Sequence, residues 1–322
     1  MSIMDDAKEK WSGMINEVTL GATSEEGGSR TAVVTVGGAG ALPYMTFEGP
    51  SPRSPVIAME VWDCEPDDWA QPLMNALGPV VKSPADWARK CVEEFGASMI
   101  CLRLAGTHPD FGNASPETAA AVVKSVLKAT GVPLIIWGSE HDEKDNQVLP
   151  CCSQAAAGER CLMGTVKEDN YKTLVASCLA DGHSIIALSP IDINIAKQVN
   201  ILVSEMGFPL SRVVMYPTTG ALGYGIEYAY SIQERGRLAA LAGDKMMSLP
   251  VICMVGAEAW RTKESKASAQ ENPGWGDEAT RGILWEVGTA STLLQAGSDI
   301  IVMRHPAAVA AIRKTIGELM SK

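Results

Sequence analysis

Residues 96–104 read GASMICLRL, and this stretch shows the pattern that decides the fold: a glycine, two spacer residues and a short apolar run. Glycine suits the left-handed conformation that ends a helix. A continuous apolar run is typical of a strand that is buried on both faces, as parallel sheets require. The same joint recurs where Gly131, Gly207 and Gly297 precede Pro133–Trp137, Val213–Tyr216 and Ile300–Met303. The sequence therefore predicts helices that alternate with buried parallel strands.

Eight apolar runs of this kind occur along the chain, and segments with helical periodicity separate them. The predicted strands are Val56–Val61, Met99–Leu104, Pro133–Trp137, Cys161–Thr165, Ser184–Leu188, Val213–Tyr216, Val251–Val255 and Ile300–Met303. Helix starts are predicted where a serine precedes a proline, at Ser83–Pro84, Ser115–Pro116 and Ser189–Asp192. Eight parallel strands are the number that closes a barrel. We therefore expect an α/β fold of the TIM (β/α)8 type.

Two β-rich runs, Glu17–Ala22 and Thr31–Val36, precede the barrel and flank a turn-like stretch, Ser24–Ser29. This arrangement predicts a β-hairpin, which we expect to close the N-terminal end of the barrel. We accordingly divide the chain into an N-terminal extension with the hairpin, residues 1–50, and a TIM barrel, residues 51–322. Lys263–Asp277 is predicted to be an extended loop after the seventh strand, with a functional or interfacial role.

The composition excludes several classes of partner. The formal net charge is −11 without a local basic patch, which argues against nucleic acid and anionic membrane surfaces as partners. Met1–Asn16 lacks the apolar core of a signal peptide, and no run approaches the roughly 20 apolar residues of a membrane span. We expect a cytoplasmic protein whose eight cysteines are free thiols, most of them packed in the core.

The working face of a TIM barrel lies at the carboxyl ends of its strands, so candidate cofactor-binding residues are sought there. They are Thr107, His108, Trp137, Asp192, Asn194, Tyr216, Thr218, Glu258 and His305. Together they supply the polar and aromatic groups of a ligand mouth. Any single one could equally cap a helix or bind water at the rim. No catalytic residue can be assigned, because no triad is visible in the sequence.

The sequence offers no convincing metal site of its own. Cys151–Cys152 is an adjacent pair without any C-x-x-C motif, and we interpret it as part of a helix. We therefore expect no iron–sulfur cluster on this chain. The glycine-rich stretch Gly220–Gly225 precedes a helix, where phosphate binding or tight packing against a neighbour are both open. Its spacing matches neither phosphate-binding fingerprint, which favours packing.

Six spaced stretches, in order along the chain, resemble one family: the small subunit of the corrinoid/iron–sulfur protein, related to the delta subunit of the archaeal acetyl-CoA decarbonylase/synthase complex. The stretches are Glu17–Thr23 with Thr35–Gly38 and Ala41–Pro43, then Ala58–Val61, Ser189–Asn194, Leu222–Tyr228, Pro273–Gly276 and Met303–Pro306. The chain departs from the family pattern at Tyr216, where an aspartate is common, and near Ala105, where an acidic residue is common. These departures suggest a different partner or corrinoid substituent.

The resemblance implies a TIM barrel that pairs with a large subunit carrying a [4Fe–4S] cluster and a cobalamin-binding domain. The corrinoid would lie between the two subunits. Methyl would pass from methyltetrahydrofolate, through a methyltetrahydrofolate:corrinoid methyltransferase, to cobalt and then to CO dehydrogenase/acetyl-CoA synthase, as in the Wood–Ljungdahl pathway. The chain would thus be a carrier subunit rather than a stand-alone enzyme, with the cofactor supplying the chemistry.

Asp181-Gly182-His183 imitates the start of the D-x-H-x-x-G signature of cobalamin carriers, in which the histidine binds cobalt. Ile186 stands at the glycine position, and the triplet precedes a strand, which places it on the N-terminal face. We interpret the triplet as the end of a helix.

Two other functions stay open at the level of sequence. One is a pterin-binding methyltransferase of the same barrel class, in which Asp192 and Asn194 would hold the pterin. Binding of methyltetrahydrofolate and unaided methylation of added cobalamin would favour this reading. The other is a non-catalytic scaffold that only docks the large subunit. Substitutions of Tyr216, Thr218 or His305 that leave corrinoid affinity and methyl transfer unchanged would favour the scaffold.

Overall fold

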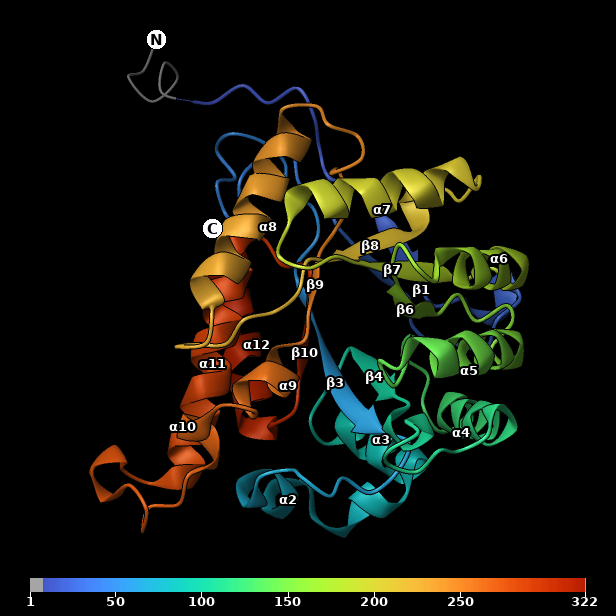
Figure 1. Cartoon of the computed structure of the whole chain (residues 1–322). Coiled ribbons are helices and arrows are strands. Elements are labelled where there is room, and N and C mark those ends of the chain that lie inside the picture. The colour runs from blue at the N-terminus through green and yellow to red at the C-terminus, as the bar shows by residue number, and fades with distance from the viewer. Residues whose placement is uncertain (1–7, 322) are drawn as a thin grey trace.

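The computed structural model describes residues 8–321. Eight parallel strands form one barrel (Figure 1). The strands are β3 (Val56–Trp62), β4 (Met99–Arg103), β5 (Leu134–Trp137), β6 (Leu162–Val166), β7 (Ser184–Leu188), β8 (Val213–Tyr216), β9 (Ile252–Cys253) and β10 (Ile300–Met303). Their hydrogen-bonded order is β8-β7-β6-β5-β4-β3-β10-β9. The ring closes where Met215 forms a parallel bridge with Val251 and donates its N–H to the Pro250 carbonyl at 2.8 Å. The predicted TIM barrel is confirmed.

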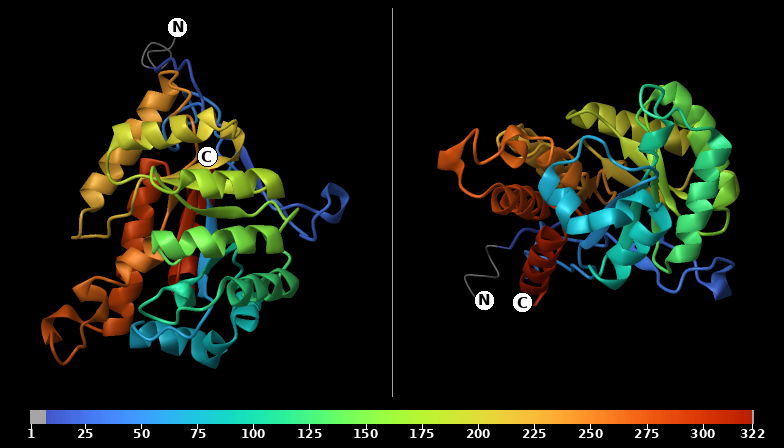
Figure 2. Two further views of the ribbon diagram at one scale, coloured as in Figure 1. Left: turned by 45° about the vertical axis from the view of Figure 1, so that its right-hand side comes forward. Right: turned by 90° about the horizontal axis from the view of Figure 1, so that it is seen from below.

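Helices surround the barrel on both sides (Figures 1 and 2). One side carries α4 (Pro116–Ala129), α5 (Asp142–Ala155), α6 (Tyr171–Asp181) and α7 (Ile193–Glu205). The other carries α8 (Ile226–Leu241), α11 (Glu278–Ala296) and α12 (Pro306–Met320). The shorter helices are α2 (Gln71–Leu77), α3 (Pro84–Glu93), α9 (Val255–Ala259) and α10 (Lys263–Lys266), and single 3-10 turns cover Ser24–Glu26, Gly78–Lys82, Ala105–Thr107, Leu210–Arg212 and Pro273–Trp275. None of the helices between residues 8 and 321 combines the length and the hydrophobicity that crossing a membrane requires.

Alternate side chains of each strand face the barrel interior and the helix layer. In β4, Met99 and Cys101 belong to the interior cluster, while Ile100 and Leu102 pack with the surrounding helices. All four are fully buried, which explains why the strand has a continuous apolar run. Six of the eight free cysteines are buried, as expected from their apolar surroundings.

The N-terminal hairpin consists of β1 (Val18–Leu20) and β2 (Val34–Val36), which pair antiparallel with Val18 opposite Val36. Val18, Leu20 and Val36 are buried in the same cluster as the interior side chains of the barrel. The hairpin is therefore confirmed, and its apolar face contributes to the interior packing.

Two of the predicted helix starts are confirmed and one is displaced. Ser83 and Ser115 accept hydrogen bonds from backbone N–H groups at the starts of α3 and α4. The third helix, α7, begins after Asp192, whose carboxylate accepts from the N–H groups of Asn194 and Ile195. Ser189 still belongs to the strand ladder, since its N–H donates to the Tyr216 carbonyl of β8 at 3.1 Å, and the helix starts only after Asp192.

The seventh strand is shorter than predicted. The sequence suggested Val251–Val255, but β9 ends at Cys253 and α9 begins at Val255. The N–H of Met254 donates to the Thr219 hydroxyl at 2.9 Å instead of to a neighbouring strand, which ends the pairing. The following segment, predicted as an extended loop, contains α10 and the turn Pro273–Trp275.

Candidate functional site

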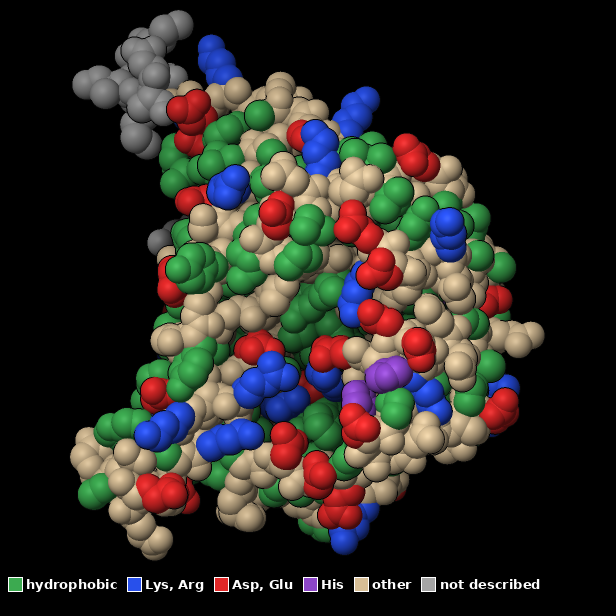
Figure 3. All heavy atoms as spheres, in the orientation of Figure 1, with side chains coloured by type: hydrophobic (Ala, Val, Ile, Leu, Met, Phe, Trp, Pro, Cys, Tyr) green, Lys and Arg blue, Asp and Glu red, His purple; other side chains and the backbone are tan. Residues whose placement is uncertain are grey.

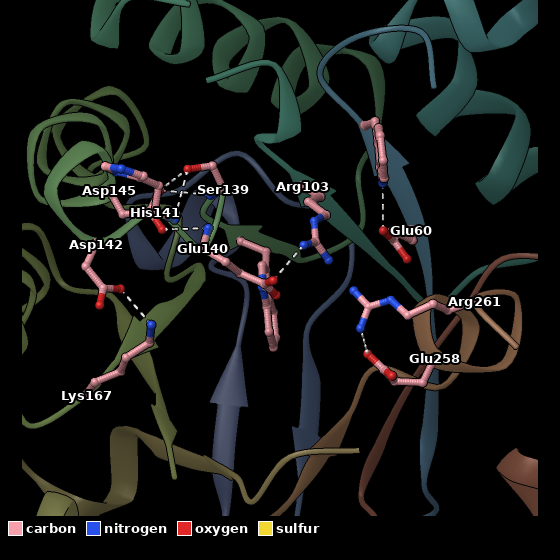
Figure 4. Close-up of polar contacts among 12 residues, drawn as sticks. Glu60, Arg103, Ser139, Glu140, His141, Asp142, Asp145, Lys167, Glu258 and Arg261 are labelled. Carbon is pink, nitrogen blue, oxygen red and sulfur yellow. Dashed lines mark hydrogen bonds and ion pairs between the residues drawn. The ribbon is translucent and has the colours of Figure 1, made fainter. Parts of the chain in front are cut away.

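A buried ion pair joins two strands at the carboxyl end of the barrel. Glu60 of β3 accepts two hydrogen bonds from the guanidinium of Arg304, which follows β10, at 2.7 and 2.8 Å. Glu60 also accepts from the indole N–H of Trp62 at 2.7 Å (Figure 4). Burial alone would raise the pKa of Glu60, but the charge and hydrogen bonds of Arg304 outweigh burial and the pKa is lowered. The pair is therefore ionised and fixed in place.

A tight turn after β5 carries a carboxylate to the mouth of the barrel. Glu140 has a φ of 73°, in the left-handed region that residues with side chains rarely adopt. Asp145 of α5 holds this turn, because its carboxylate accepts from the N–H and hydroxyl of Ser139, both at 2.8 Å, and from the Glu140 N–H at 2.9 Å (Figure 4). Gly138 allows this approach, since a Cβ there would lie 2.4 Å from an Asp145 oxygen.

Glu140 forms the second ion pair of the mouth, with Arg103 of β4 at 3.0 Å. Its other carboxylate oxygen accepts from the indole N–H of Trp137 at 3.3 Å. Trp137 packs edge to face against Tyr216, with ring centres 5.0 Å apart. Burial, together with the charges of Glu258 and Glu140, raises the pKa of Tyr216, so its phenol stays protonated. The two rings close the barrel interior next to the charged mouth.

A third ion pair comes from the segment after β9. Glu258 of α9 binds Arg261 at 3.0 Å, and this pair lies across from Arg103 and Glu140 (Figure 4). Burial raises the pKa of Glu258, and the charge of Glu140 adds to the effect although Arg261 opposes it. Carboxylates from two sides therefore face one another across the mouth.

Glu286 of α11 organises the backbone that carries Arg304. Its fully buried carboxylate accepts from the Arg304 N–H at 2.6 Å, from the His305 N–H at 3.1 Å and from the Trp260 indole at 2.7 Å. Burial raises the pKa of Glu286 to about 7, against the effect of these donors. The carboxylate ties α11 and the end of β10 to one side of the mouth.

His305 is packed beneath the rim and does not face the mouth freely. Its ring stacks on Trp260 with centres 5.8 Å apart, and its Nδ1 accepts from the Ala307 N–H at 3.1 Å as the N-cap of α12. Burial lowers the pKa of His305 to about 4. The imidazole is therefore neutral at physiological pH, and it acts as a helix cap.

This low pKa predicts an acid-dependent loss of stability. Because the folded pKa lies below the unfolded value of 6.5, the stabilisation is complete above pH 6.5 and is lost as the pH falls toward 4. His305→Asn keeps a capping side chain but cannot titrate. We expect the free energy of unfolding of the natural protein to fall relative to this variant by on the order of 2 kcal/mol between pH 6.5 and 4, after allowance for solvent screening. Urea unfolding at several pH values measures the difference, and a constant difference would contradict the prediction.

Two neighbouring cavities open at the mouth, in the hollow visible in Figure 3. The larger has a volume of about 290 Å³, and His108, Phe111 and Ser139 contribute to its lining. The smaller, of about 110 Å³, shares Trp62, Asp68 and Arg103 with it. Phe111 is 42% exposed and meets Trp62 edge to face at 6.4 Å.

The structure separates the nine candidate residues into three groups. His108 lines the larger cavity, and Glu258 lies at the opposite side of the mouth. Four others are buried and engaged in packing or caps: Thr107, whose hydroxyl bonds the Leu104 carbonyl, with Trp137, Tyr216 and His305. The remaining three follow β7 and β8: Asp192 caps α7, Thr218 donates to the Ser189 carbonyl at 2.7 Å, and the Asn194 side chain is exposed.

Sequence reasoning missed Arg103, Glu140, Arg261 and Glu286. Arg103 had a usable signal, because it is the one charged residue in an otherwise apolar strand. Glu286 had a weaker signal as a carboxylate on the buried face of α11. Glu140 and Arg261 lie in segments whose local geometry the sequence pattern does not specify.

The two motifs that sequence analysis set aside are structural. His183 is buried at the N-terminal side of β7, where its Nδ1 accepts from the Cys161 N–H at 3.1 Å and its Nε2 lies 2.9 Å from the Ser153 carbonyl. The loop Gly220–Gly225 packs on α11, since the Leu222 carbonyl accepts from the Trp285 indole at 3.1 Å. Among residues 8–321, no three His, Cys, Asp or Glu side chains are grouped to hold a metal ion.

Comparison with known proteins decides the family. The family described as CO dehydrogenase/acetyl-CoA synthase delta subunit matches residues 17–315. This chain belongs to that family. Acetyl-CoA decarbonylase/synthase complex subunit delta of Archaeoglobus fulgidus is 36% identical over 320 residues, covering 98% of this chain and 70% of the relative. The subunit of the same name from Methanocaldococcus jannaschii is 37% identical over 319 residues, covering 97% and 76%.

Solved structures of dihydropteroate synthases have the same fold. Dihydropteroate synthase of Xanthomonas albilineans, with 4-aminobenzoic acid, superposes with a TM-score of 0.55 at 14% identity, over 84% of this chain and 95% of that one. The enzyme of Stenotrophomonas maltophilia gives 0.56 at 14% identity, over 84% and 94%. At such low identity, the superposition shows that the delta-subunit family member and these enzymes have the same barrel fold.

Proposed function

We propose that this protein is the small subunit of a heterodimeric corrinoid/iron–sulfur protein, which carries methyl groups between methyltetrahydrofolate:corrinoid methyltransferase and acetyl-CoA synthase. The match to the delta-subunit family over residues 17–315 supports this most strongly. The corrinoid supplies a cobalt atom that accepts and releases the methyl group. In this proposal the corrinoid-binding domain and the [4Fe–4S] cluster belong to the large subunit, and the heterodimer works in the cytoplasm.

The chemistry of the mouth fits one wall of a shared corrinoid chamber. A corrin ring is larger than either cavity, so this chain would cover only part of it. The amide groups at the edge of a corrin need both donors and acceptors, which Arg103 and Glu140 offer at the rim. Phe111 and Trp62 supply apolar surface that excludes water. The ion pairs behind them hold these groups in fixed positions.

The nine candidate residues differ in how close they lie to the open mouth. We propose His108 and Glu258 as direct contacts of the corrinoid, because both lie at the open mouth. Asp192, Asn194 and Thr218 would meet the partner at the part of the rim after β7 and β8. Thr107, Trp137, Tyr216 and His305 would act indirectly, by shaping the rim from below.

Co-purification tests the proposal. Expressed alone, the protein is expected to bind corrinoid too weakly to retain it through gel filtration, whereas co-expression with its large subunit should give a complex that keeps its corrinoid absorbance bands. Bands retained by this chain alone would overturn the proposal. Binding of methyltetrahydrofolate with unaided methylation of cobalamin would instead support the pterin-dependent enzyme.

A matched pair of substitutions locates the corrinoid wall. Phe111→Asp places a charge on the rim, while Phe47→Asp places one on the N-terminal extension, where Phe47 is 51% exposed. We expect Phe111→Asp to lower the corrinoid content of the purified complex at least tenfold, because a buried unpaired carboxylate opposes closure of the chamber. Phe47→Asp should leave it within about twofold. A loss of corrinoid from Phe47→Asp but not from Phe111→Asp would place the corrinoid elsewhere.

A further inference from the structure

The smaller cavity of the mouth is lined by more cationic than anionic side chains, and each of its three arginines is paired with a carboxylate outside the lining. Four cationic side chains line it, against the single carboxylate of Asp68, in a chain whose net charge is −11: Arg103, Arg261, Lys266 and Arg304. They come from β4, from the segment after β9 and from the end of β10. Figure 3 shows Lys and Arg side chains gathered in the hollow of this face. The fold brings them together from positions up to 201 residues apart, 304 minus 103.

Each arginine is fixed by one carboxylate and keeps donors to spare. Arg304 uses Nε and Nη2 on Glu60, so its described contacts leave Nη1 without an acceptor. Arg103 meets Glu140 through Nη2 only. A guanidinium has five N–H groups in a fixed fork, so an arginine held in this way can still bind an anion through another edge.

Lys266 and Arg261 are the exposed cations of the lining, although Arg261 is paired with Glu258 at 3.0 Å. The ammonium of Lys266 reaches only the backbone carbonyl of Asp68, at 3.5 Å, among its described contacts. The Arg261 side chain is 66% exposed. Neither contact is needed to hold the barrel, unlike the buried Arg304 pair.

The remaining walls of the cavity are aromatic. Trp62, Trp69 and Trp260 line it, and the guanidinium of Arg304 lies 4.3 Å from the ring centre of Trp69. The indole N–H of Trp69 is buried without a hydrogen-bond acceptor in the structure. A buried donor without an acceptor is costly, and an anionic oxygen in the cavity would supply one.

The size of the cavity restricts what can enter it. At about 110 Å³ it is far smaller than the roughly 300–1,000 Å³ of sites that enclose whole drug-sized molecules. It can hold one phosphate or carboxylate group, but neither a corrin nor a pterin ring. The larger cavity, which shares Trp62 and Arg103, lies beside it.

We propose that the smaller cavity is an anion subsite that binds a phosphate or carboxylate group of a larger ligand lying across the mouth. Binding of the anionic group itself is independent of the proposed function. The identity of the larger ligand rests on the proposed function, since a corrinoid has a phosphate in its nucleotide loop and a folate has carboxylates in its glutamate tail.

Titration of inorganic phosphate into the full chain, followed by ³¹P NMR at low ionic strength, tests the subsite. We expect saturable one-to-one binding, weakened at least tenfold in Arg261→Gln/Lys266→Gln because two charged donors are lost. Lys124→Gln/Lys314→Gln removes the same net charge from α4 and α12, away from the cavity, and should change affinity less than twofold. No saturable binding, or equal weakening in both double variants, would overturn the proposal.

Competition identifies the source of the anion. Displacement of phosphate by cobalamin but not by cobinamide, which lacks the nucleotide phosphate, would assign the corrinoid loop. Displacement by tetrahydrofolate but not by a tetrahydropterin without glutamate would assign the folate tail. Displacement by none of them would refute the link to a ligand of the mouth. Failure of the proposed function shows separately, as absence of corrinoid from the complex with the large subunit.

Discussion

Replacing Arg304 with methionine is expected to lower the free energy of unfolding by about 3–5 kcal/mol at pH 7, because it leaves the Glu60 carboxylate buried without its partner. Glu60 has no exposed side-chain surface, and its remaining direct donor is the Trp62 indole. The two residues lie 244 positions apart and join the first and last strands of the barrel. Chemical unfolding followed by circular dichroism measures the loss.

The pH dependence and a double variant separate charge from packing. In Arg304→Met the pKa of Glu60 should rise, so the loss is expected to shrink as the pH falls and the carboxyl becomes protonated. Glu60→Gln/Arg304→Met removes both charges while keeping an acceptor for Trp62, and should recover most of the stability. A single variant within about 1 kcal/mol of the natural protein at pH 7 would show that the pair is not an important source of stability.

The barrel could be predicted because its signal is repeated eight times. A strand such as β4 is buried on both faces, so its apolar run is continuous, and the glycine before it marks the end of a helix. The predicted end of a strand was wrong where a single hydrogen bond overrides the hydrophobic pattern. The N–H of Met254 bonds the Thr219 side chain and shortens β9, although the run Val251–Val255 is fully apolar.

The candidate site was harder to predict because strand ends alone do not fix side-chain direction. Thr107 follows β4 closely, yet its hydroxyl turns back to the Leu104 carbonyl. His305 has the chemistry of a proton carrier, but its position before Pro306 makes it a helix cap. Glu140 reaches the mouth only through a left-handed turn held by Asp145, which no local pattern announces. The family resemblance identified the function more directly than any of these residues.

Gly282→Ala is expected to destabilise the protein by about 2 kcal/mol, the upper end of the overpacking cost less the gain in helix propensity, although alanine is the better helix former. Helix propensity alone predicts a gain of about 0.5–1 kcal/mol at an interior position of α11. A Cβ at Gly282, however, would lie 2.4 Å from the ring of Trp260. That ring cannot easily retreat, because it is 1% exposed, stacks on His305 and donates to Glu286. Overpacking of this kind typically costs about 1–3 kcal/mol.

Gly317→Ala is the matched control, because it is also a helical glycine but has no atom within 4 Å of the added Cβ. This variant should gain up to about 1 kcal/mol from propensity alone. The two glycines therefore predict changes of opposite sign for one chemical substitution, measured by the same urea unfolding experiment. Displacement of Trp260 should also disturb Arg304 and weaken phosphate binding at the mouth, since Glu286 holds both residues. A stabilised Gly282→Ala variant would mean that Trp260 moves freely, which is incompatible with a rigid wall at this side of the mouth.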